Sequence, residues 1–559
     1  MDFMSACLRL LRSGACPVAT IAGCLGATFW LRSRMTDQSI DELWGRAQVL
    51  MSAGETTAAR GVLEALLLRQ QGHAAAHMTL SHIAWSDGRV RDAARHALDA
   101  ARGLPTEPMS IIAVAMALLR TGETVAARTC LEQPALAGAD AGPTVMYHAG
   151  LRRELGEEAE ALRLLDRAHE LGVDGPEFRF ARGMEHLICG YPQQAQGDFE
   201  ASLQMDPTAC AATFELARLR KQTPERNHLD DFNRRRLLVA HGSQDHAALE
   251  FACYKELEDI GRYNEAWGAL TKANAIMRAL HPWVPEHMRY QVDRLVEICT
   301  SAPPTPEPDV HEGPQPIFVF GLPRSGTTLL DRLLGSHSGV VSVGELEDFA
   351  RQLCWASDQR GLLDARMLER LPELDYRQIG HRYLAQTQWR AHGARFFIDK
   401  QPWNWMVAGL IQRALPHARL LHLVRDPMDV CFSNFRAMLG ARYAYSFDLQ
   451  TLAGHFHQYT RLMAHWHEAM PGRILDVSYC DLVGDTEAMM RKVVKFCGLD
   501  WEPACLDPSR NTRPIGTLSA MQARAAIHGG TFGAWRRYER QLAAMAKSIR
   551  SCPPSRAGS

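Results

Sequence analysis

The residues most able to do chemistry follow a run of β-forming apolar residues, 316–320. The run ends at a glycine, and a helical pattern begins a few residues later, which is typical of a strand, a phosphate loop and a helix. Backbone N–H groups of such a loop and the helix N-terminus bind an oxyanion. We expect the anion to be held by Arg324, Ser325, Gly326, Thr327 and Thr328.

The glycines Gly321 and Gly326 have the spacing of a Walker loop, but the Walker lysine is missing. Thr327 stands in its place, and Arg324 offers a cation from inside the loop instead. A nucleoside triphosphatase needs that lysine on its β- and γ-phosphates. The loop therefore favours a nucleotide with fewer phosphates and no metal.

Short β-forming runs alternate with helical patterns from residue 316 onward, which predicts a parallel α/β sheet covered by helices. Ligands of such sheets lie at the carboxyl ends of the strands. The expected strands are 317–320, 340–343, 395–398, 419–424 and 473–477.

The segment Gly-Leu-Pro-Arg-Ser-Gly-Thr-Thr, residues 321–328, resembles the 5′-phosphosulfate loop of the sulfotransferase family. The nearest likeness is to tyrosylprotein sulfotransferases and to bacterial sulfotransferases with tetratricopeptide repeats. The resemblance covers residues 316–545 and implies 3′-phosphoadenosine-5′-phosphosulfate (PAPS) as donor, with no metal. It also implies that Arg425 and Ser433 hold the 3′-phosphate. The family often has a further arginine four residues later, where this chain has Ala437 preceded by Arg436.

Two further segments resemble the catalytic residues of that family. Glu345 matches the first Glu of its Gly-Glu-Glu segment, whereas the usual base position holds Leu346, so the base is Glu345 or Glu347. A carboxylate is needed to take the proton of the attacking hydroxyl, and we favour Glu345 because it follows the strand directly. Lys400, in Asp-Lys-Gln-Pro, would stabilise charge on the departing phosphate, together with Arg324.

Weaker matches lie near the C-terminus. Tyr479 matches a family tyrosine that contacts the cofactor, and residues 530–537 resemble the loop that closes over the nucleotide. Gly533 replaces a serine there, so only its backbone N–H could act, while Trp535 and Arg536 would cover the adenine. No histidine has the spacing of a metal site or a triad, and His422 is expected in the core.

The N-terminal half carries a repeat of 34 residues, the period of tetratricopeptide repeats, which are paired antiparallel helices. A glycine marks each turn and an alanine five residues later marks the packing face. The five pairs are Gly54 and Ala59, Gly88 and Ala93, Gly122 and Ala127, Gly156 and Ala161, and Gly190 and Ala195. A sixth pair, Gly261 and Ala266, is out of phase, which indicates an insertion at residues 224–246.

The expected fold class is an α-helical tetratricopeptide solenoid followed by a phosphate-loop α/β sulfotransferase domain. The divisions are an extension at 1–37, the solenoid at 38–300, a Pro-rich linker at 301–316 and the sulfotransferase domain at 316–549. Residues 15–31 are apolar, so the extension is a signal-like segment, a weak anchor, or untranslated if translation begins at Met35. The repeats would hold a protein or peptide, or pack as a cap or homodimer contact.

Composition fits a soluble protein, with 46% hydrophobic and 22% charged residues and a formal net charge of −1. That charge implies no attraction to nucleic acid. The 14 scattered cysteines favour a reducing compartment, which we take as the cytoplasm. The prediction is sulfuryl transfer from PAPS to a hydroxyl of a protein tyrosine, a glycan or a phenol, with a large acceptor favoured. The alternatives are a phosphate-loop kinase or nucleotidase and a silent scaffold.

Overall fold

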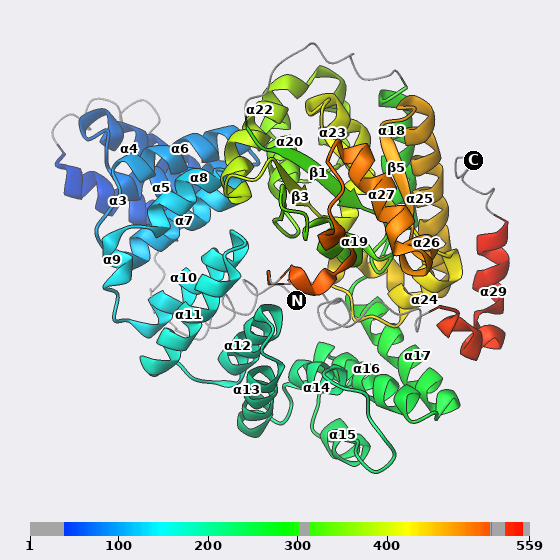
Figure 1. Cartoon of the computed structure of the whole chain (residues 1–559). Coiled ribbons are helices and arrows are strands. Elements are labelled where there is room, and N and C mark those ends of the chain that lie inside the picture. The colour runs from blue at the N-terminus through cyan, green and yellow to red at the C-terminus, as the bar shows by residue number, and fades with distance from the viewer. Residues whose placement is uncertain (1–37, 301–312, 512, 515, 517–531, 552–559) are drawn as a thin grey trace. The chain divides into compact units, whose positions relative to one another are not determined.

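The computed structural model describes residues 38–300, 313–511, 513, 514, 516 and 532–551 (Figure 1). The extension at 1–37, most of the linker at 301–316 and the first two residues of the expected loop 530–537 lie outside the described residues. The chain forms two compact units. One holds the residues up to Gly172 together with Ala350–Arg370, and the other holds Val173–Phe349 and the residues from Leu371 onward.

The first unit consists of antiparallel helix pairs, as the repeat predicts. Each turn between paired helices carries a glycine with φ between +77° and +84°, a region that L side chains rarely adopt. The alanine five residues later is buried in every pair. The helices are α3 (Ile40–Ser52), α4 (Thr56–Arg69), α5 (Ala74–Ser86), α6 (Val90–Arg102), α7 (Pro108–Thr121), α8 (Thr124–Leu131), α9 (Pro134–Ala137), α10 (Gly142–Glu154) and α11 (Glu158–Glu170).

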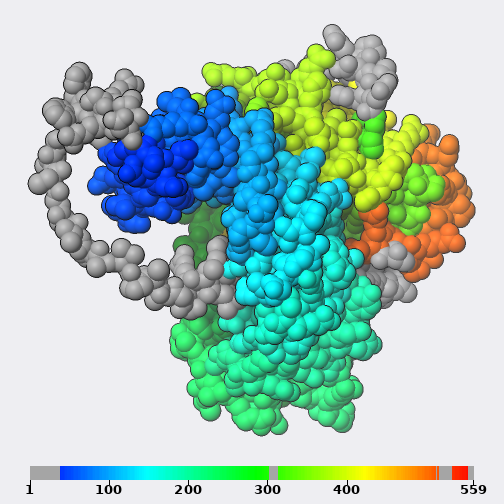
Figure 2. Space-filling model, turned by 90° about the vertical axis from the view of Figure 1, so that its left-hand side faces the viewer, coloured from blue at the N-terminus to red at the C-terminus, as the bar shows by residue number. Residues whose placement is uncertain are grey.

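A segment from the C-terminal half also belongs to this first unit. It contains α21 (Ala365–Arg370) and most of α20 (Asp348–Ser357). The Gln352 amide donates a hydrogen bond of 3.0 Å to the carbonyl of Gly122, the glycine between α7 and α8. Asp358 accepts a bond of 2.8 Å from the N–H of Arg91 in the first turn of α6. The helices of this unit, blue to cyan, pack side by side in Figure 2.

The second unit begins with the remaining helices of the repeat region. The interval 224–246, where the sequence indicates an insertion, holds one short helix. Ala195 and Ala266, the packing-face alanines of the last repeats, are fully buried. The helices are α12 (Pro176–Cys189), α13 (Pro192–Met205), α14 (Cys210–Arg218), α15 (Leu229–Arg236), α16 (Gln244–Asp259), α17 (Tyr263–Leu280) and α18 (Pro285–Ile298).

The second unit also contains a parallel sheet, part of which is labelled in Figure 1. It has five strands in the order β2-β3-β1-β4-β5. All five predicted strands are present, which confirms the α/β part of the fold class. The chain leaves β1 toward one edge of the sheet and later crosses to the other, so the loop after β1 lies at the switch point where ligands bind. The strands are β1 (Gln315–Phe320), β2 (Val340–Ser342), β3 (Phe396–Asp399), β4 (Arg419–Val424) and β5 (Ile474–Ser478).

Helices follow the strands, and both faces of the sheet are buried, because Phe318 and Phe320 are as fully buried as Ile317 and Val319. Burial of these apolar side chains is the main force that stabilises the sheet, and it thereby fixes the positions of the strand ends. The core includes Ile317, Val319, Leu330, Leu333, Leu421, Leu423, Val477 and Val493. The helices are α19 (Thr327–Leu334), α22 (Tyr376–Thr387), α23 (Ala408–Ala414), α24 (Pro427–Phe435), α25 (Leu449–Ala469), α26 (Tyr479–Gly484), α27 (Thr486–Cys497) and α29 (Glu539–Arg550).

Candidate active site

The loop after β1 adopts a backbone conformation that requires glycine at two positions. Gly326, which begins α19, has φ +112°, and a Cβ there would lie 2.3 Å from the ring of Tyr479. A Cβ on Gly321 would lie 2.8 Å from the carbonyl oxygen of Leu423 in β4. Arg324 adopts φ +68°, which is uncommon for a residue with a side chain. The loop is therefore held tightly between β4 and α26.

Inside this loop, one buried hydroxyl indicates a ligand. The side chain of Ser325 is only 2% exposed, and its Oγ has no hydrogen-bond partner. A buried hydroxyl without a partner is costly unless a bound group satisfies it. Thr327 and Thr328, also buried, form the first turn of α19, where the helix N-terminus favours an anion.

An arginine cluster lies beside the loop. The Nε of Arg324 is 3.4 Å from the Oγ of Ser433 on α24. Arg425, which directly follows β4, donates a 3.1 Å bond from Nη1 to the carbonyl of Arg324. Asp426 caps α24 by accepting a 2.9 Å bond from the N–H of Asp429. The structure thus brings together Arg324, Arg425 and Ser433, which are far apart in the sequence.

The electrostatics of this cluster favour an anion. Burial, together with the charges of Arg218, Arg436 and Arg425, lowers the pKa of Arg324 to about 9. Burial also lowers the pKa of Arg425. Like charges in a poorly solvated place raise each other's energy, and a bound anion relieves that cost.

A second group of charges follows β2 and β3. The Nζ of Lys400 lies 2.5 Å from the Oε1 of Glu345, and the backbone N–H of Lys400 donates a 2.9 Å bond to the carbonyl of Gly344. Lys400 is 2% exposed, whereas Glu345 is 34% exposed. Because Phe318 of β1 pairs with Asp399 of β3, Lys400 is at the same edge of the sheet as the loop after β1.

The other candidate carboxylate, Glu347, has different partners. Arg442 holds it through two bonds, of 2.6 Å to Oε1 and 3.1 Å to Oε2. The amide of Gln401 donates a third bond of 3.1 Å. Glu347 thus accepts three hydrogen bonds, from Arg442 and Gln401, whereas Glu345 accepts the bond from Lys400.

Residues 316–503 match the model of the sulfotransferase family. The C-terminal part of the chain is a sulfotransferase-family domain. An uncharacterized protein of Aquifex aeolicus is 31% identical over 316 residues, which are 54% of this chain and 41% of that one. Protein-tyrosine sulfotransferase 2 of Gallus gallus is 25% identical over 211 residues, 34% of this chain and 53% of that one. The chain thus spans about half the length of these relatives or less.

Among solved structures, the sulfotransferase domain from the Synechococcus PCC 7002 olefin synthase is 22% identical, with a TM-score of 0.30. The alignment covers 44% of this chain and 99% of that domain. Within the described residues, no helix combines the length and the apolar character that crossing a bilayer requires.

The C-terminal residues of the sulfotransferase domain contact the arginine cluster. The ring of Tyr479 lies 4.6 Å from the Arg425 guanidinium and 5.5 Å from the ring of Phe532. The N–H of Gly533 donates to the carboxylate of Asp429 at 2.9 Å and 3.2 Å, so this N–H is already used. Trp535 and Arg536 follow in a short helical turn, Ala534–Tyr538, with the guanidinium of Arg536 over the Trp535 ring.

Sequence reasoning assigned no role to several residues that support the site. Asp399, the last residue of β3, is fully buried beneath Lys400, and the hydroxyl of Tyr383 donates a 2.8 Å bond to it. Burial raises the pKa of Asp399 to about 8. Arg442, which donates two bonds to Glu347, also had no assigned role, because only the fold brings its segment to the site.

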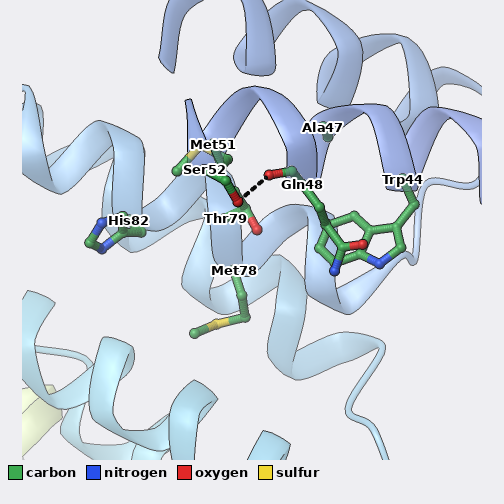
Figure 3. A pocket seen from close by; sticks show the side chains of 8 residues that line it. All are labelled: Trp44, Ala47, Gln48, Met51, Ser52, Met78, Thr79 and His82. Carbon is green, nitrogen blue, oxygen red and sulfur yellow. Dashed lines mark hydrogen bonds between the residues drawn. The ribbon is translucent and has the colours of Figure 1, made fainter. Parts of the chain in front are cut away.

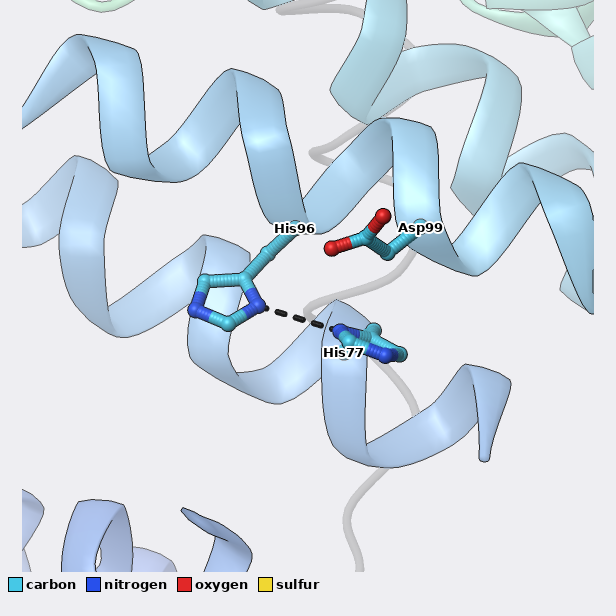
Figure 4. Close-up of side chains that lie close together, drawn as sticks. All are labelled: His77, His96 and Asp99. Carbon is cyan, nitrogen blue, oxygen red and sulfur yellow. Dashed lines mark hydrogen bonds between the residues drawn. The ribbon is translucent and has the colours of Figure 1, made fainter. Parts of the chain in front are cut away.

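Two histidine groups in the described residues have the composition of metal sites. In the first, the Nδ1 atoms of His77 and His96 are 3.0 Å apart, and His77 Nε2 is 2.8 Å from the carbonyl of Gln71 (Figure 4). Because a carbonyl only accepts, Nε2 of His77 donates and its Nδ1 accepts from His96. Burial lowers the pKa of His96 to about 4, so His96 is neutral at pH 7. The hydrogen bonds explain this group without a metal.

The second group joins His422 of β4 to β5. His422 Nδ1 lies 2.7 Å from the carboxylate of Asp476, which His467 also contacts at 3.0 Å. Burial would raise the pKa of Asp476, but the hydrogen bonds from these two histidines outweigh it, so the pKa is lowered. His422 is buried against the ring of Phe320, as expected for a core residue.

The repeat region contains a separate hollow of about 450 Å³ between α3 and α5 (Figure 3). Its wall combines one indole, two thioethers and several polar side chains. The lining residues are Trp44, Ala47, Gln48, Met51, Ser52, Met78, Thr79 and His82.

Proposed function

We propose that this protein transfers a sulfuryl group from PAPS to an acceptor hydroxyl. The observation that carries the proposal is the lysine-free anion loop beside Arg425 and Ser433, with the Glu345–Lys400 pair at the same sheet edge. An arginine and serine beside the loop suit a second phosphate on the nucleotide. The match to the sulfotransferase family supports this assignment.

Glu345, Lys400 and Arg324 have separate roles in the proposed reaction. Glu345 takes the proton as the acceptor oxygen bonds to sulfur. The bond between sulfur and the 5′-phosphate oxygen breaks, and its electron pair stays on that oxygen. Lys400 stabilises the charge that develops there, aided by Arg324 and by the N–H groups of the loop. The products are the sulfated acceptor and adenosine 3′,5′-bisphosphate, and the proton remains on Glu345 until solvent removes it.

The acceptor we propose is a hydroxyl on a protein or peptide. The relatives named as protein-tyrosine sulfotransferases support this class, and the hollow between α3 and α5 offers a peptide-sized surface. A homodimer contact through the repeats and a cytoplasmic location remain proposals from the sequence, as do the cofactor-binding roles of Tyr479, Gly533, Trp535 and Arg536.

The test is transfer of ³⁵S from labelled PAPS to proteins of a cell lysate, with EDTA present. We expect labelled polypeptides with the wild-type chain and none with Glu345→Gln. A parallel reaction with γ-³²P-ATP and Mg²⁺ should leave the lysate's labelling unchanged by added protein. Label from ATP and none from PAPS would favour the kinase alternative. Label from neither, with no nucleotide binding, would favour the scaffold.

A further inference from the structure

Two carbonyls of the loop after β1 are bound from the segment that carries the proposed 3′-phosphate pair. The Nδ2 of Asn434 on α24 donates a 2.7 Å bond to the carbonyl of Pro323. Arg425 donates a 3.1 Å bond to the carbonyl of Arg324, the next residue of the loop. The Nε of Arg324 in turn lies 3.4 Å from the Oγ of Ser433. The loop is thus tied to residues at both ends of one short segment.

The side chain of Asn434 is held firmly enough to fix the loop. It is 1% exposed, and its nitrogen also donates a 2.8 Å bond to the carbonyl of Val430, one turn earlier in α24. An amide nitrogen has two hydrogens, so both are used. The Oδ1 of Asn434 is buried and has no hydrogen-bond partner among the described residues. The side chain is therefore oriented by its nitrogen, which joins its own helix to the loop.

The bond to Pro323 also accounts for an unusual backbone conformation. Arg324 has φ +68°, which is uncommon for a residue with a side chain and persists only where the surrounding contacts fix it. The peptide groups on either side of Arg324 are both bound, one by Asn434 and the other by Arg425. Because the N–H of a trans peptide points opposite to its carbonyl, the bond from Asn434 also sets the direction of the Arg324 N–H.

The helix α24 is itself held by the repeat region, so it gives the loop a fixed support. The buried side chain of Asn274 on α17 donates a 3.0 Å bond to the carbonyl of Phe435. The indole of Trp267 on α17 lies 5.8 Å from the ring of Phe435. Glu258 of α16 pairs with Arg436, which directly follows α24, at 3.3 Å. All of these helices belong to the same compact unit.

We infer that Asn434 is a positioning residue that sets the distance between the loop after β1 and the 3′-phosphate pair. This inference rests on the proposed function. Because Asn434 is adjacent to Ser433, its bond to Pro323 joins the two phosphate-binding places directly. A nucleotide with two phosphates binds well only if both places keep the separation of those phosphates. A nucleotide without the 3′-phosphate uses the loop alone and does not depend on this separation.

The test is calorimetric binding of adenosine 3′,5′-bisphosphate and of 5′-AMP to the full chain. Asn434→Leu keeps most of the side-chain volume without the donor, and Asn434→Ala removes the donor while favouring the helix. Both should weaken bisphosphate binding roughly fivefold, the worth of about one hydrogen bond, and leave AMP binding within about twofold. Melting curves establish that each variant is folded.

Gln412 on α23 provides the matched control. It is as buried as Asn434, and its amide donates a 2.7 Å bond to the carbonyl of Pro416. Pro416 precedes β4, at the opposite edge of the sheet from the loop after β1. Gln412→Leu and Gln412→Ala should lower the melting temperature, because a buried bond is lost, and keep the wild-type preference for bisphosphate. Only a positioning role moves that preference.

Hydrogen exchange of the wild type needs no variant. Under the proposed function, the phosphate of 5′-AMP contacts the loop and not Ser433. Slower exchange in α24 on adding AMP would therefore come through the bond between Asn434 and Pro323. We expect AMP to slow exchange in peptides covering 427–436 as well as in those covering the loop. Slower exchange in the loop alone would contradict the inference.

The calorimetric outcomes separate the inference from the function beneath it. An unchanged preference in both Asn434 variants would overturn the inference alone, provided that the wild type prefers bisphosphate over AMP. Equal weakening of both nucleotides would also overturn it, because the bond would then support the loop and not the separation. A loss of preference in Asn434→Ala but not in Asn434→Leu would assign the effect to side-chain volume, against the inference. A wild type without preference would overturn the proposed function itself, and the inference with it.

Discussion

The two ends of the candidate site use charge in opposite ways. At the nucleotide end, Arg425 contacts the loop that holds Arg324, and burial together with nearby arginine charges lowers the pKa of Arg324. At the catalytic end, opposite charges are paired, Lys400 with Glu345 and Arg442 with Glu347. The like charges at the nucleotide end favour a bound anion. At the catalytic end, the opposite charges are already paired in the absence of substrate.

This difference separates binding from chemistry. Substitutions at the arginine end should change nucleotide affinity, because the stored repulsion is relieved by phosphate. Substitutions at the paired end should change turnover, because Lys400 and Glu345 gain new partners only during transfer. The predictions below test whether the two ends behave so differently.

Removing the carboxylate at the catalytic end should have the largest effect. Glu345→Gln keeps the size and a hydrogen bond to Lys400 but cannot take a proton. We expect the turnover number to fall on the order of 10²- to 10⁴-fold, with affinity for adenosine 3′,5′-bisphosphate within twofold. Turnover is measured as ³⁵S transfer from PAPS. The matched control is Glu347→Gln, which loses the ion pair with Arg442 and should retain most activity. If Glu347→Gln lost turnover and Glu345→Gln kept it, Glu347 would be the base.

Lys400→Gln tests the other half of the pair. Loss of the ammonium should lower turnover on the order of 10²- to 10³-fold, as for removal of one transition-state donor. Because the charge acts on the departing phosphate, the Michaelis constant for PAPS should change much less. If Lys400→Gln raised only the Michaelis constant for PAPS and kept its turnover, Lys400 would act in nucleotide binding and not in the chemical step.

The smallest effect concerns the buried Asp399 beneath the pair. Its pKa is raised by burial to about 8, above its value in the unfolded chain, so its favourable contribution is fully present below pH 4 or so. That contribution is lost as pH rises and is gone above the folded pKa. The wild-type melting temperature should therefore fall between pH 5 and 8 more steeply than that of Asp399→Asn. The exposed Asp500→Asn is the control, and parallel curves for all three proteins would contradict the account.

Patterns carried by local sequence could be predicted. The repeat was visible because Gly122 and its equivalents need positive φ, and alanines such as Ala127 tolerate no larger side chain at the helix contact. The strands were visible because buried parallel strands are continuous apolar runs between turns. The phosphate loop was visible because Gly321 and Gly326 occupy places where a Cβ would clash.

Contacts between distant segments could not be predicted. Nothing near Gln352 indicates that residues 350–370 pack with the first repeats, because their partners lie more than 190 residues away. The choice between Glu345 and Glu347 also needed the fold, since it depends on which cation each carboxylate meets.

The central claim is that one bisphosphorylated adenosine is held by the loop after β1 and by the Arg425–Ser433 pair together. The most direct measurement is calorimetry of the wild-type chain with adenosine 3′,5′-bisphosphate and with 5′-AMP at matched salt. The account predicts binding of the bisphosphate at least about tenfold tighter, the worth of one charge-assisted phosphate contact. Equal affinity for the two nucleotides would contradict it.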